Sequence, residues 1–196
     1  MADTICRPSL GYLTSPCIGT ASGGEFSPFE PHLSRIDIED IALGLSREAR
    51  FAGQSRQKLT VAEHCIAVAS IIPRRFALWG LLHDASEAYM HDLSAPFKHS
   101  PPLADWRIHE KWVQGHIYLH FGCHGDEPPH VKLADQLMYR IEQFDLMPRN
   151  RPGFPRTPPP RHPLLPRYDT RNTMGEDEAR ERFLGLFYHL TAKRDI

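Results

Sequence analysis

The residues best suited to chemistry lie in one short stretch, where the apolar segment 76–82 leads directly into an adjacent His83–Asp84 pair. Glu87 follows three residues after Asp84, so on a helix it lies one turn from both members of the pair, and the three side chains share a face. Polar groups on a face that should be buried are costly unless something binds them. Imidazole nitrogen and carboxylate oxygen suit zinc, manganese, iron or cobalt, so the pattern predicts a divalent-metal site and, with it, a hydrolase.

Two further candidate ligands, His64 and Asp135, lie on predicted helices of their own, one before the pair and one after it. The series His64, His83–Asp84, Asp135 resembles the H…HD…D signature of the HD-domain metal-dependent phosphohydrolases, both in order and in helical placement. The resemblance covers roughly residues 36–147. It implies an all-α HD-domain bundle in which these four side chains hold one divalent ion, with cobalt, zinc, manganese and magnesium as candidates.

The same resemblance implies roles for residues around the metal. Glu87 matches the family's acid that activates or positions water, and Asp92 resembles the second acid of the small nucleotidase branch. Arg50 and Phe51, which precede the first histidine, resemble that branch's pair that grips the phosphate and the nucleoside. Glu87 and Asp92 are therefore the expected catalytic acids, and Arg50 and Phe51 the expected substrate contacts.

Two kinds of substrate fit this pattern. The stretch 36–53 is similar to compact phage and bacterial HD proteins that include dATP triphosphohydrolases, whereas the acidic spacing equally resembles bacterial 5′-deoxynucleotidases. In both, metal-activated water attacks the α-phosphorus and expels the nucleoside, which leaves triphosphate from a dNTP or orthophosphate from a dNMP. We favour the triphosphohydrolase because of the similarity over 36–53 and because a triphosphate needs more basic side chains than a monophosphate. The candidates to contact it are Arg50, Lys98 and Lys132, with Arg56 or Lys58 as further candidates.

Plainer interpretations exist for each candidate. His83–Asp84 could be a buried hydrogen-bonded pair, Asp135 a surface partner of Lys132, and Asp92 a residue that caps a turn. A rival metal cluster is also conceivable, since His116, His120 and His124 recur every four residues with Cys123 and His130 nearby. A glycine before His124 is expected to end that helix, so we interpret these histidines as structural or surface residues.

Hydrophobic spacing and helix-capping signals predict an all-α fold of five or six helices with a small N-terminal β element. Helices are expected over 38–47, 60–72, 74–90, 102–121, 130–147 and 175–193. Four parts follow along the chain: an arm or hairpin over 1–35, the HD-domain core over 36–147, a Pro/Arg-rich strap over 148–171 and, over 172–196, a C-terminal segment whose helix packs on the core.

Composition narrows the function classes. The 196 residues suffice for one domain, and a net charge of −1 gives no positive field for a nucleic-acid polymer. No apolar run approaches the roughly 20 residues of a membrane span, and the N-terminus lacks a signal-peptide layout, so we expect a cytoplasmic protein of a bacterium or a phage-infected host cell. The four scattered cysteines (Cys6, Cys17, Cys65, Cys123) are expected to be free thiols.

The expected partners are a small nucleotide and further copies of this chain, as a dimer or a hexamer. Two alternatives belong to other functional classes. One is a catalytically idle HD fold that senses nucleotides, which the presence of all four ligands and Glu87 argues against. The other is a scaffold in which the proline-rich run 156–161 binds a partner protein.

Overall fold

The computed structural model describes residues 15–150, 152–154, 156–163 and 171–192. Most of these residues are helical, so the all-α prediction is confirmed. The helices are α1 (Ile38–Arg47), α2 (Val61–Ser70), α3 (Ala77–Leu82), α4 (Glu87–Met90), α5 (Ala95–Lys98), α6 (Ala104–His120), α7 (Pro129–Leu146) and α8 (Glu176–Thr191). Short 3₁₀ turns cover Arg50–Gly53, Arg74–Phe76 and Pro101–Leu103. The expected small β element is the antiparallel hairpin of β1 (Ile18–Gly19) and β2 (Glu25–Phe26).

The helices begin where the local sequence provides capping groups. Asp37 caps α1, because its carboxylate accepts the backbone N–H of Glu39 at 3.0 Å. Thr60 caps α2 through the predicted capping box: its hydroxyl accepts the backbone N–H of Glu63, and the Glu63 carboxylate accepts that of Thr60. This second cap fixes the start of the helix that carries His64 one residue further on.

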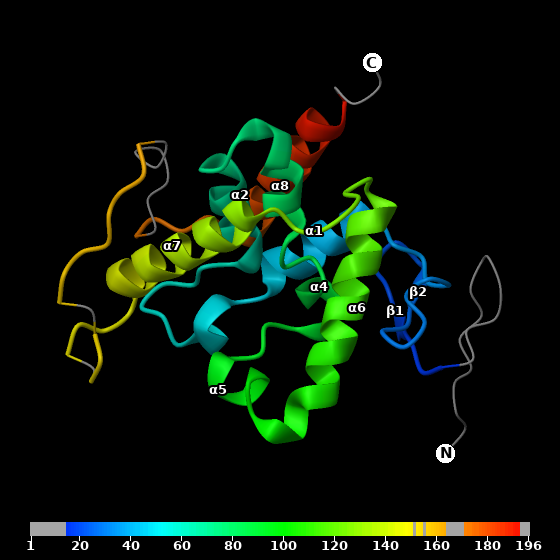
Figure 1. Cartoon of the computed structure of the whole chain (residues 1–196), viewed down its shortest axis with the longest axis horizontal. Helices are drawn as coiled ribbons and strands as arrows, with labels where there is room; N and C mark the ends of the chain where they lie inside the picture. Colours follow the sequence, from blue (N-terminus) through cyan, green and yellow to red (C-terminus); the bar gives the residue numbers. More distant parts are fainter. Residues whose placement is uncertain (1–14, 151, 155, 164–170, 193–196) are drawn as a thin grey trace.

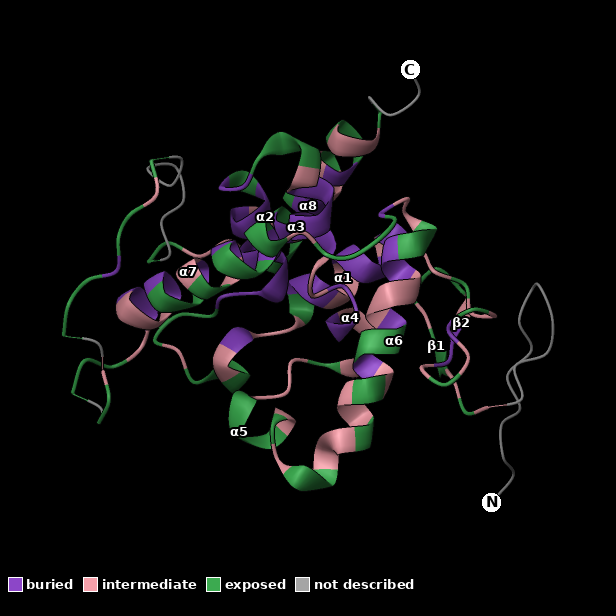
Figure 2. Ribbon diagram, in the orientation of Figure 1, coloured by how far each residue is buried: buried purple, intermediate pink, exposed green. Residues whose placement is uncertain are grey.

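The core lies where α1, α2, α3 and α8 meet, and in Figure 2 their inner faces form a continuous buried region. The C-terminal helix α8 contributes Phe183 and Phe187 to this core, so it packs on the domain. Gly44 permits a close contact between α1 and α4, since a Cβ at this position would lie 2.8 Å from the Ala88 carbonyl oxygen. That contact fixes the position of Glu87, the first residue of α4.

Figure 1 shows that α6 stands along one side of the core and that α7 crosses the other side. The segment around the β1–β2 hairpin lies against α6, where the rings of Phe29 and His109 meet edge to face at 5.1 Å. In Figure 1 the short helix α4 lies between α6 and α7, and α5 lies near the lower end of α6. The chain therefore brings α2, α7 and the end of α3 to one place, which is where the candidate ligands are found.

One predicted helix is wrong. The expected continuous helix over 74–90 is divided into a 3₁₀ turn, α3, a turn over 83–86 and α4. The stretch 91–101, between two predicted helices, also contains α5 and the start of a 3₁₀ turn. At the division after Leu82, the side chain of Gln114 from another helix lies in the hydrogen-bond ladder, a contact that no local pattern could reveal.

The free-thiol prediction is only partly right. Cys65 and Cys123 are free and buried, but Cys17 is bonded in a disulfide. Disulfide formation requires two sulfurs that the fold brings together, which sequence spacing does not show. Residues 1–14 of the predicted N-terminal arm, which include Cys6, lie outside the described residues, as do residues 151, 155 and 164–170 of the predicted strap. No helix in the described ranges has the length and apolar character needed to cross a bilayer.

Candidate metal centre

Two buried histidines present their Nε2 atoms to each other. His64 of α2 is fully buried and donates from Nδ1 to the Glu142 carboxylate at 2.7 Å. His83, directly after α3, donates from Nδ1 to the Gly80 carbonyl oxygen at 2.8 Å. Because both Nδ1 atoms carry the hydrogen, both Nε2 atoms offer lone pairs, and they lie 3.2 Å apart.

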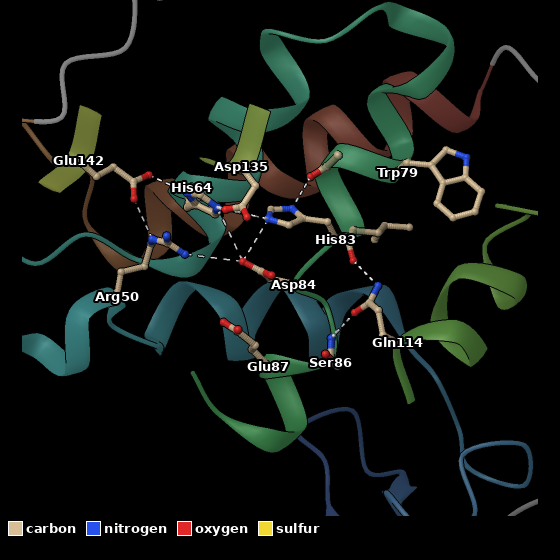
Figure 3. A network of polar contacts seen from close by, with 12 residues as sticks. Arg50, His64, Trp79, His83, Asp84, Ser86, Glu87, Gln114, Asp135 and Glu142 are labelled. Atoms are coloured by element: carbon tan, nitrogen blue, oxygen red, sulfur yellow. Dashed lines mark hydrogen bonds and ion pairs between the residues drawn. The ribbon is translucent and has the colours of Figure 1, made fainter. Parts of the chain in front are cut away.

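Carboxylate oxygens complete the cluster (Figure 3). Asp84 Oδ2 lies 3.2 Å from His83 Nε2 and 3.8 Å from His64 Nε2. Asp135 Oδ1, from α7, lies 3.1 Å from His64 Nε2 and 3.9 Å from His83 Nε2. The ligand atoms of His64, His83 and Asp84 all lie within 4.8 Å of one another, so these three residues form a group that could hold a metal ion.

The chemistry of the donor set fits a cation. Two lone-pair nitrogens and two carboxylate oxygens repel one another unless positive charge lies among them. Without an ion, a proton on His83 supplies this charge and occupies its Nε2 lone pair. Burial lowers the pKa of the His83 imidazole, but the neighbouring Asp84 and Cys65 together outweigh burial and raise this pKa well above its ordinary value. Burial likewise raises the pKa of Asp84, yet the positive charge of His83 overcomes that effect and leaves it low. Imidazole nitrogens and carboxylates at these distances are the ligands that zinc, manganese and cobalt use.

Glu142 and Arg50 form a buried support behind the ligands. Glu142 is completely buried on α7 and accepts from His64 Nδ1 and, at 2.9 Å, from Arg50 Nε. Arg50 also approaches Asp84, with 3.6 Å between Nη1 and Oδ2. Sequence reasoning missed Glu142, although it lies seven residues after Asp135 and therefore on the same helix face. Carboxylates in this position orient a metal-binding imidazole and raise its basicity.

A cavity of about 690 Å³ opens in front of the cluster. Its lining contains seven of the ten predicted site residues: Arg50, Phe51, Asp84, Glu87, Asp92, Lys98 and Asp135. The two histidines do not line it, but His64 contacts Asp135 and His83 contacts Asp84, and both of these aspartates line the cavity. Lys132 is exposed and does not line the cavity, so its predicted contact with phosphate stays a prediction. Three residues of α7 that the sequence analysis missed do line it: Gln136, Tyr139 and Arg140.

The two predicted catalytic acids lie beside each other in the cavity wall. Glu87 is 5% exposed, and its Oε2 has no hydrogen-bond partner among the described residues. Burial, together with the charges of Asp84 and Asp92, raises the pKa of Glu87 well above its ordinary value. Burial also raises the pKa of Asp92. Glu87 therefore favours its protonated form more than an exposed glutamate does.

The Glu48 side chain holds Asp92 through the backbone N–H of Asp92. Its N–H donates to Glu48 Oε1 at 3.2 Å, and the neighbouring His91 donates from Nδ1 to Glu48 Oε2 at 3.1 Å. His91 has φ +66° and ψ 155°, a conformation that a residue with a side chain rarely adopts. Glu48, at the end of α1, therefore fixes a strained turn at the edge of the cavity.

Aromatic rings and cations share the outer part of the cavity. The Phe51 ring lies 5.8 Å from the Tyr139 ring, and the Arg50 guanidinium lies 5.7 Å from the Phe51 centroid. Lys98 donates to Glu110 at 2.6 Å and lies 3.9 Å from Glu87. These groups are of the kinds that contact a base and a phosphate.

The rival histidine cluster does not form. The group of His64, His83 and Asp84 is the one set of three metal-binding side chains found in the described part of the chain. As expected, α6 ends at His120. His124 therefore does not continue the spacing, and His116 instead donates to a backbone carbonyl of its own helix at 2.9 Å.

The chain resembles two bacterial proteins. No protein-family model matches it. It is 36% identical over 129 residues to the uncharacterized protein YfdR of Escherichia coli, an alignment that covers 66% of this chain and 71% of YfdR. It is 31% identical over 134 residues to the uncharacterized protein RCAP_rcc00048 of Rhodobacter capsulatus, which covers 62% of this chain and 68% of that protein. From the extent and identity of these matches, the chain belongs to the same protein family as YfdR.

Proposed function

We propose that this protein is an HD-type, divalent-metal-dependent phosphohydrolase that converts a deoxynucleoside triphosphate, with dATP as the first candidate, into deoxynucleoside and triphosphate. The observation that carries the proposal is the convergence of His64, His83 and Asp84 ligand atoms beside a cavity that Asp84 lines. Asp135, within 3.1 Å of His64, would be the fourth ligand. The order of these residues along the chain matches the H…HD…D signature on which the proposal also rests.

The metal-binding residues and the cavity residues have separate tasks. A divalent cation held by the two imidazoles and two carboxylates would supply Lewis acidity, which lowers the pKa of a water ligand and neutralises phosphoryl charge. Glu87, with its raised pKa and an Oε2 that lacks a partner, would orient the attacking water and take up its proton. Arg50 and Lys98 would contact phosphoryl oxygens, and Phe51 would pack on the nucleoside.

A second candidate function is that of a 5′-deoxynucleotidase, which converts a dNMP into deoxynucleoside and orthophosphate. The observation that favours it is the charge of the cavity. Four carboxylates and three cations line the cavity, and two of those cations, Arg50 and Lys98, already form ion pairs with acidic side chains. The two further basic candidates have other partners: Arg56 donates to the Asp145 carbonyl oxygen, and Lys58 forms an ion pair with Glu176. A monophosphate demands fewer positive partners than a triphosphate does.

Phosphorus NMR of the metal-loaded protein with dATP or dAMP tests both candidates. Triphosphate released from dATP supports the first proposal, and orthophosphate released from dAMP supports the second. The controls are the same protein after chelation and the Asp84→Ala variant, neither of which should release product. If the metal-loaded wild type turns over neither nucleotide, the enzyme proposals are wrong, and nucleotide binding in the same sample would then favour the sensor over the scaffold.

A further inference from the structure

The segment that follows α3 is not a continuous α-helix. Its backbone hydrogen bonds span three residues instead of four: the Ala85 N–H donates to the Leu82 carbonyl at 3.0 Å, and the Glu87 N–H donates to the Asp84 carbonyl at 3.0 Å. A turn of this kind advances each side chain by about 120°, compared with about 100° in an α-helix. The directions of the side chains in this segment therefore depend on the tight turn being maintained.

The side-chain amide of Gln114, from α6, occupies the gap in the hydrogen-bond ladder (Figure 3). Its Nε2 donates to the Leu82 carbonyl at 2.7 Å, and its Oε1 accepts from the Ser86 N–H at 3.0 Å. In an uninterrupted α-helix the Ser86 N–H would donate directly to the Leu82 carbonyl. Gln114 thus replaces one helical hydrogen bond by a bridge of two bonds, and the residues that it spans flank His83 and Asp84.

The chemistry of the bridge is specific to a side-chain amide. One end must donate to a carbonyl while the other accepts from an N–H, and glutamine has both groups on one plane at the end of a long side chain. A glutamate at position 114 could accept from Ser86 but would turn a second acceptor toward the Leu82 carbonyl. A methionine would fill similar space and form neither bond. The Ser86 N–H would then lose its partner, while the Leu82 carbonyl would keep only the bond from the Ala85 N–H.

Neighbouring turns of α6 contact the same region. Glu110 and Tyr118 lie one turn before and one turn after Gln114 on the same face. Glu110 accepts from Lys98 at 2.6 Å, and the Tyr118 hydroxyl lies 3.4 Å from the Trp79 carbonyl oxygen. A cavity of about 270 Å³ lies between these side chains and the turn. The contact between α6 and this part of the site is therefore largely polar, and Gln114 is at its centre.

We propose that Gln114 is a positioning residue for the metal centre: its amide holds the tight turn that directs His83 and Asp84 toward His64. The inference rests on the proposed metal site for its effect on ligand binding. The bridge itself is a property of the chain without any ion. The two parts can therefore be tested separately.

Two isosteric variants and one control suit this test. Gln114→Met removes both hydrogen bonds, and Gln114→Glu keeps the bond from Ser86 but not the one to Leu82. Gln57→Met makes the same chemical change at an exposed loop position that does not line the main cavity. Circular dichroism and thermal unfolding establish that each variant is folded before any comparison.

Hydrogen exchange of the metal-free protein tests the bridge. In Gln114→Met the amides of residues 85–88 should exchange faster than in the wild type, whereas Gln57→Met should match the wild type, because only the first variant frees the turn. If exchange at these amides is unchanged in Gln114→Met, the bridge does not hold the turn, and the inference is overturned whatever the metal measurements give.

Cobalt and manganese binding tests the positioning role. We expect Gln114→Met and Gln114→Glu to weaken the binding of either ion about 10- to 100-fold, the usual effect of losing a group that orients a ligand. The visible spectrum of the cobalt-loaded variants should also change, which a merely structural loss would not cause. Wild-type affinity and spectrum in a folded Gln114→Met protein would overturn the positioning role. If the wild type binds neither ion, the proposed function fails, and the metal part of this inference fails with it.

Discussion

The Glu142 carboxylate bridges His64 and Arg50, with 2.7 Å from its Oε1 to His64 Nδ1 and 2.9 Å from its Oε2 to Arg50 Nε. All three groups are buried. Burial raises the pKa of Glu142, but the charges and hydrogen bonds of Arg50 and His64 together outweigh it and hold the pKa below its usual value. A single carboxylate therefore orients one candidate ligand and neutralises the arginine that lines the cavity.

Loss of this carboxylate should destabilise the fold and weaken metal binding. In Glu142→Ala the buried Arg50 guanidinium loses its 2.9 Å ion pair with Glu142. Removing one partner of a buried ion pair typically costs about 3–5 kcal/mol in the free energy of unfolding. The freed His64 imidazole should also bind metal about 10- to 100-fold more weakly. Urea denaturation and a metal titration measure the two effects. Glu142→Gln can still accept a hydrogen bond from one partner, so its stability and metal affinity should lie between those of Glu142→Ala and the wild type. A Glu142→Ala protein with wild-type metal affinity would contradict the orienting role.

Substitutions at Asp84 and at Glu87 should have different effects on metal binding and on turnover. Asp84→Ala removes a proposed ligand, so bound metal and turnover should be lost together. Glu87→Gln keeps the shape of a residue outside the ligand group, so we expect bound metal to remain while turnover falls about 100-fold or more, as for loss of a positioned general base. Elemental analysis of the dialysed proteins and a product assay separate the two. If Glu87→Gln stays fully active, the acid has been assigned to the wrong residue.

The pKa of Glu87 should make the metal-free protein more stable in mild acid. Burial, with the charges of Asp84 and Asp92, raises its pKa in the folded chain well above the ordinary 4.5. Between these two values the folded state binds more protons than the unfolded state, so the free energy of unfolding falls as pH rises through the window. Urea denaturation at several pH values should show a smaller decline for Glu87→Gln. Parallel curves for the two proteins would contradict the raised pKa.

Arg140 should contribute to the discrimination between phosphate chains. Among the described residues it is the one cation lining the cavity that has no acidic partner within 4.0 Å. A triphosphate needs such a partner more than a monophosphate does, so Arg140→Gln should raise KM about tenfold for dATP and less for dAMP. Lys132→Gln provides the comparison, because Lys132 lies on the same helix but does not line the cavity. A larger KM change at Lys132 than at Arg140 would favour the original sequence prediction.

Glu48 should control the position of Asp92. Its two oxygens accept from the His91 imidazole and the Asp92 N–H, and they hold a turn whose strain is of order 1–3 kcal/mol. In Glu48→Ala this turn should relax and move Asp92, so we expect kcat/KM to fall several-fold while metal content stays constant. Steady-state kinetics with elemental analysis measure both. His91→Gly, which relieves the strain but leaves the Glu48 bond to Asp92, should retain activity, and an equal loss in both variants would mean that Glu48 acts otherwise.

The sequence by itself determined the features that depend on neighbours within one or two turns. Asp37 and the Thr60–Glu63 capping box mark the starts of α1 and α2 because a cap is a contact between residues two or three positions apart. The types and order of His64, His83, Asp84 and Asp135 were equally readable, because ligand chemistry belongs to the side chain itself. In the structure the ligand atoms of His64, His83 and Asp84 lie within 4.8 Å of one another, and Asp135 lies 3.1 Å and 3.9 Å from the two imidazoles.

Only the tertiary structure decided the contacts between helices. Gln114 interrupts the helix after Leu82, and Glu142 supports His64, across 32 and 78 residues of sequence respectively. On α7, Arg140 lines the cavity and Lys132 does not, a difference that depends on how the helix is rotated against the core. The physical reason is that such contacts depend on the packing angle and rotation of whole helices, which many buried side chains set together and no short stretch of sequence encodes.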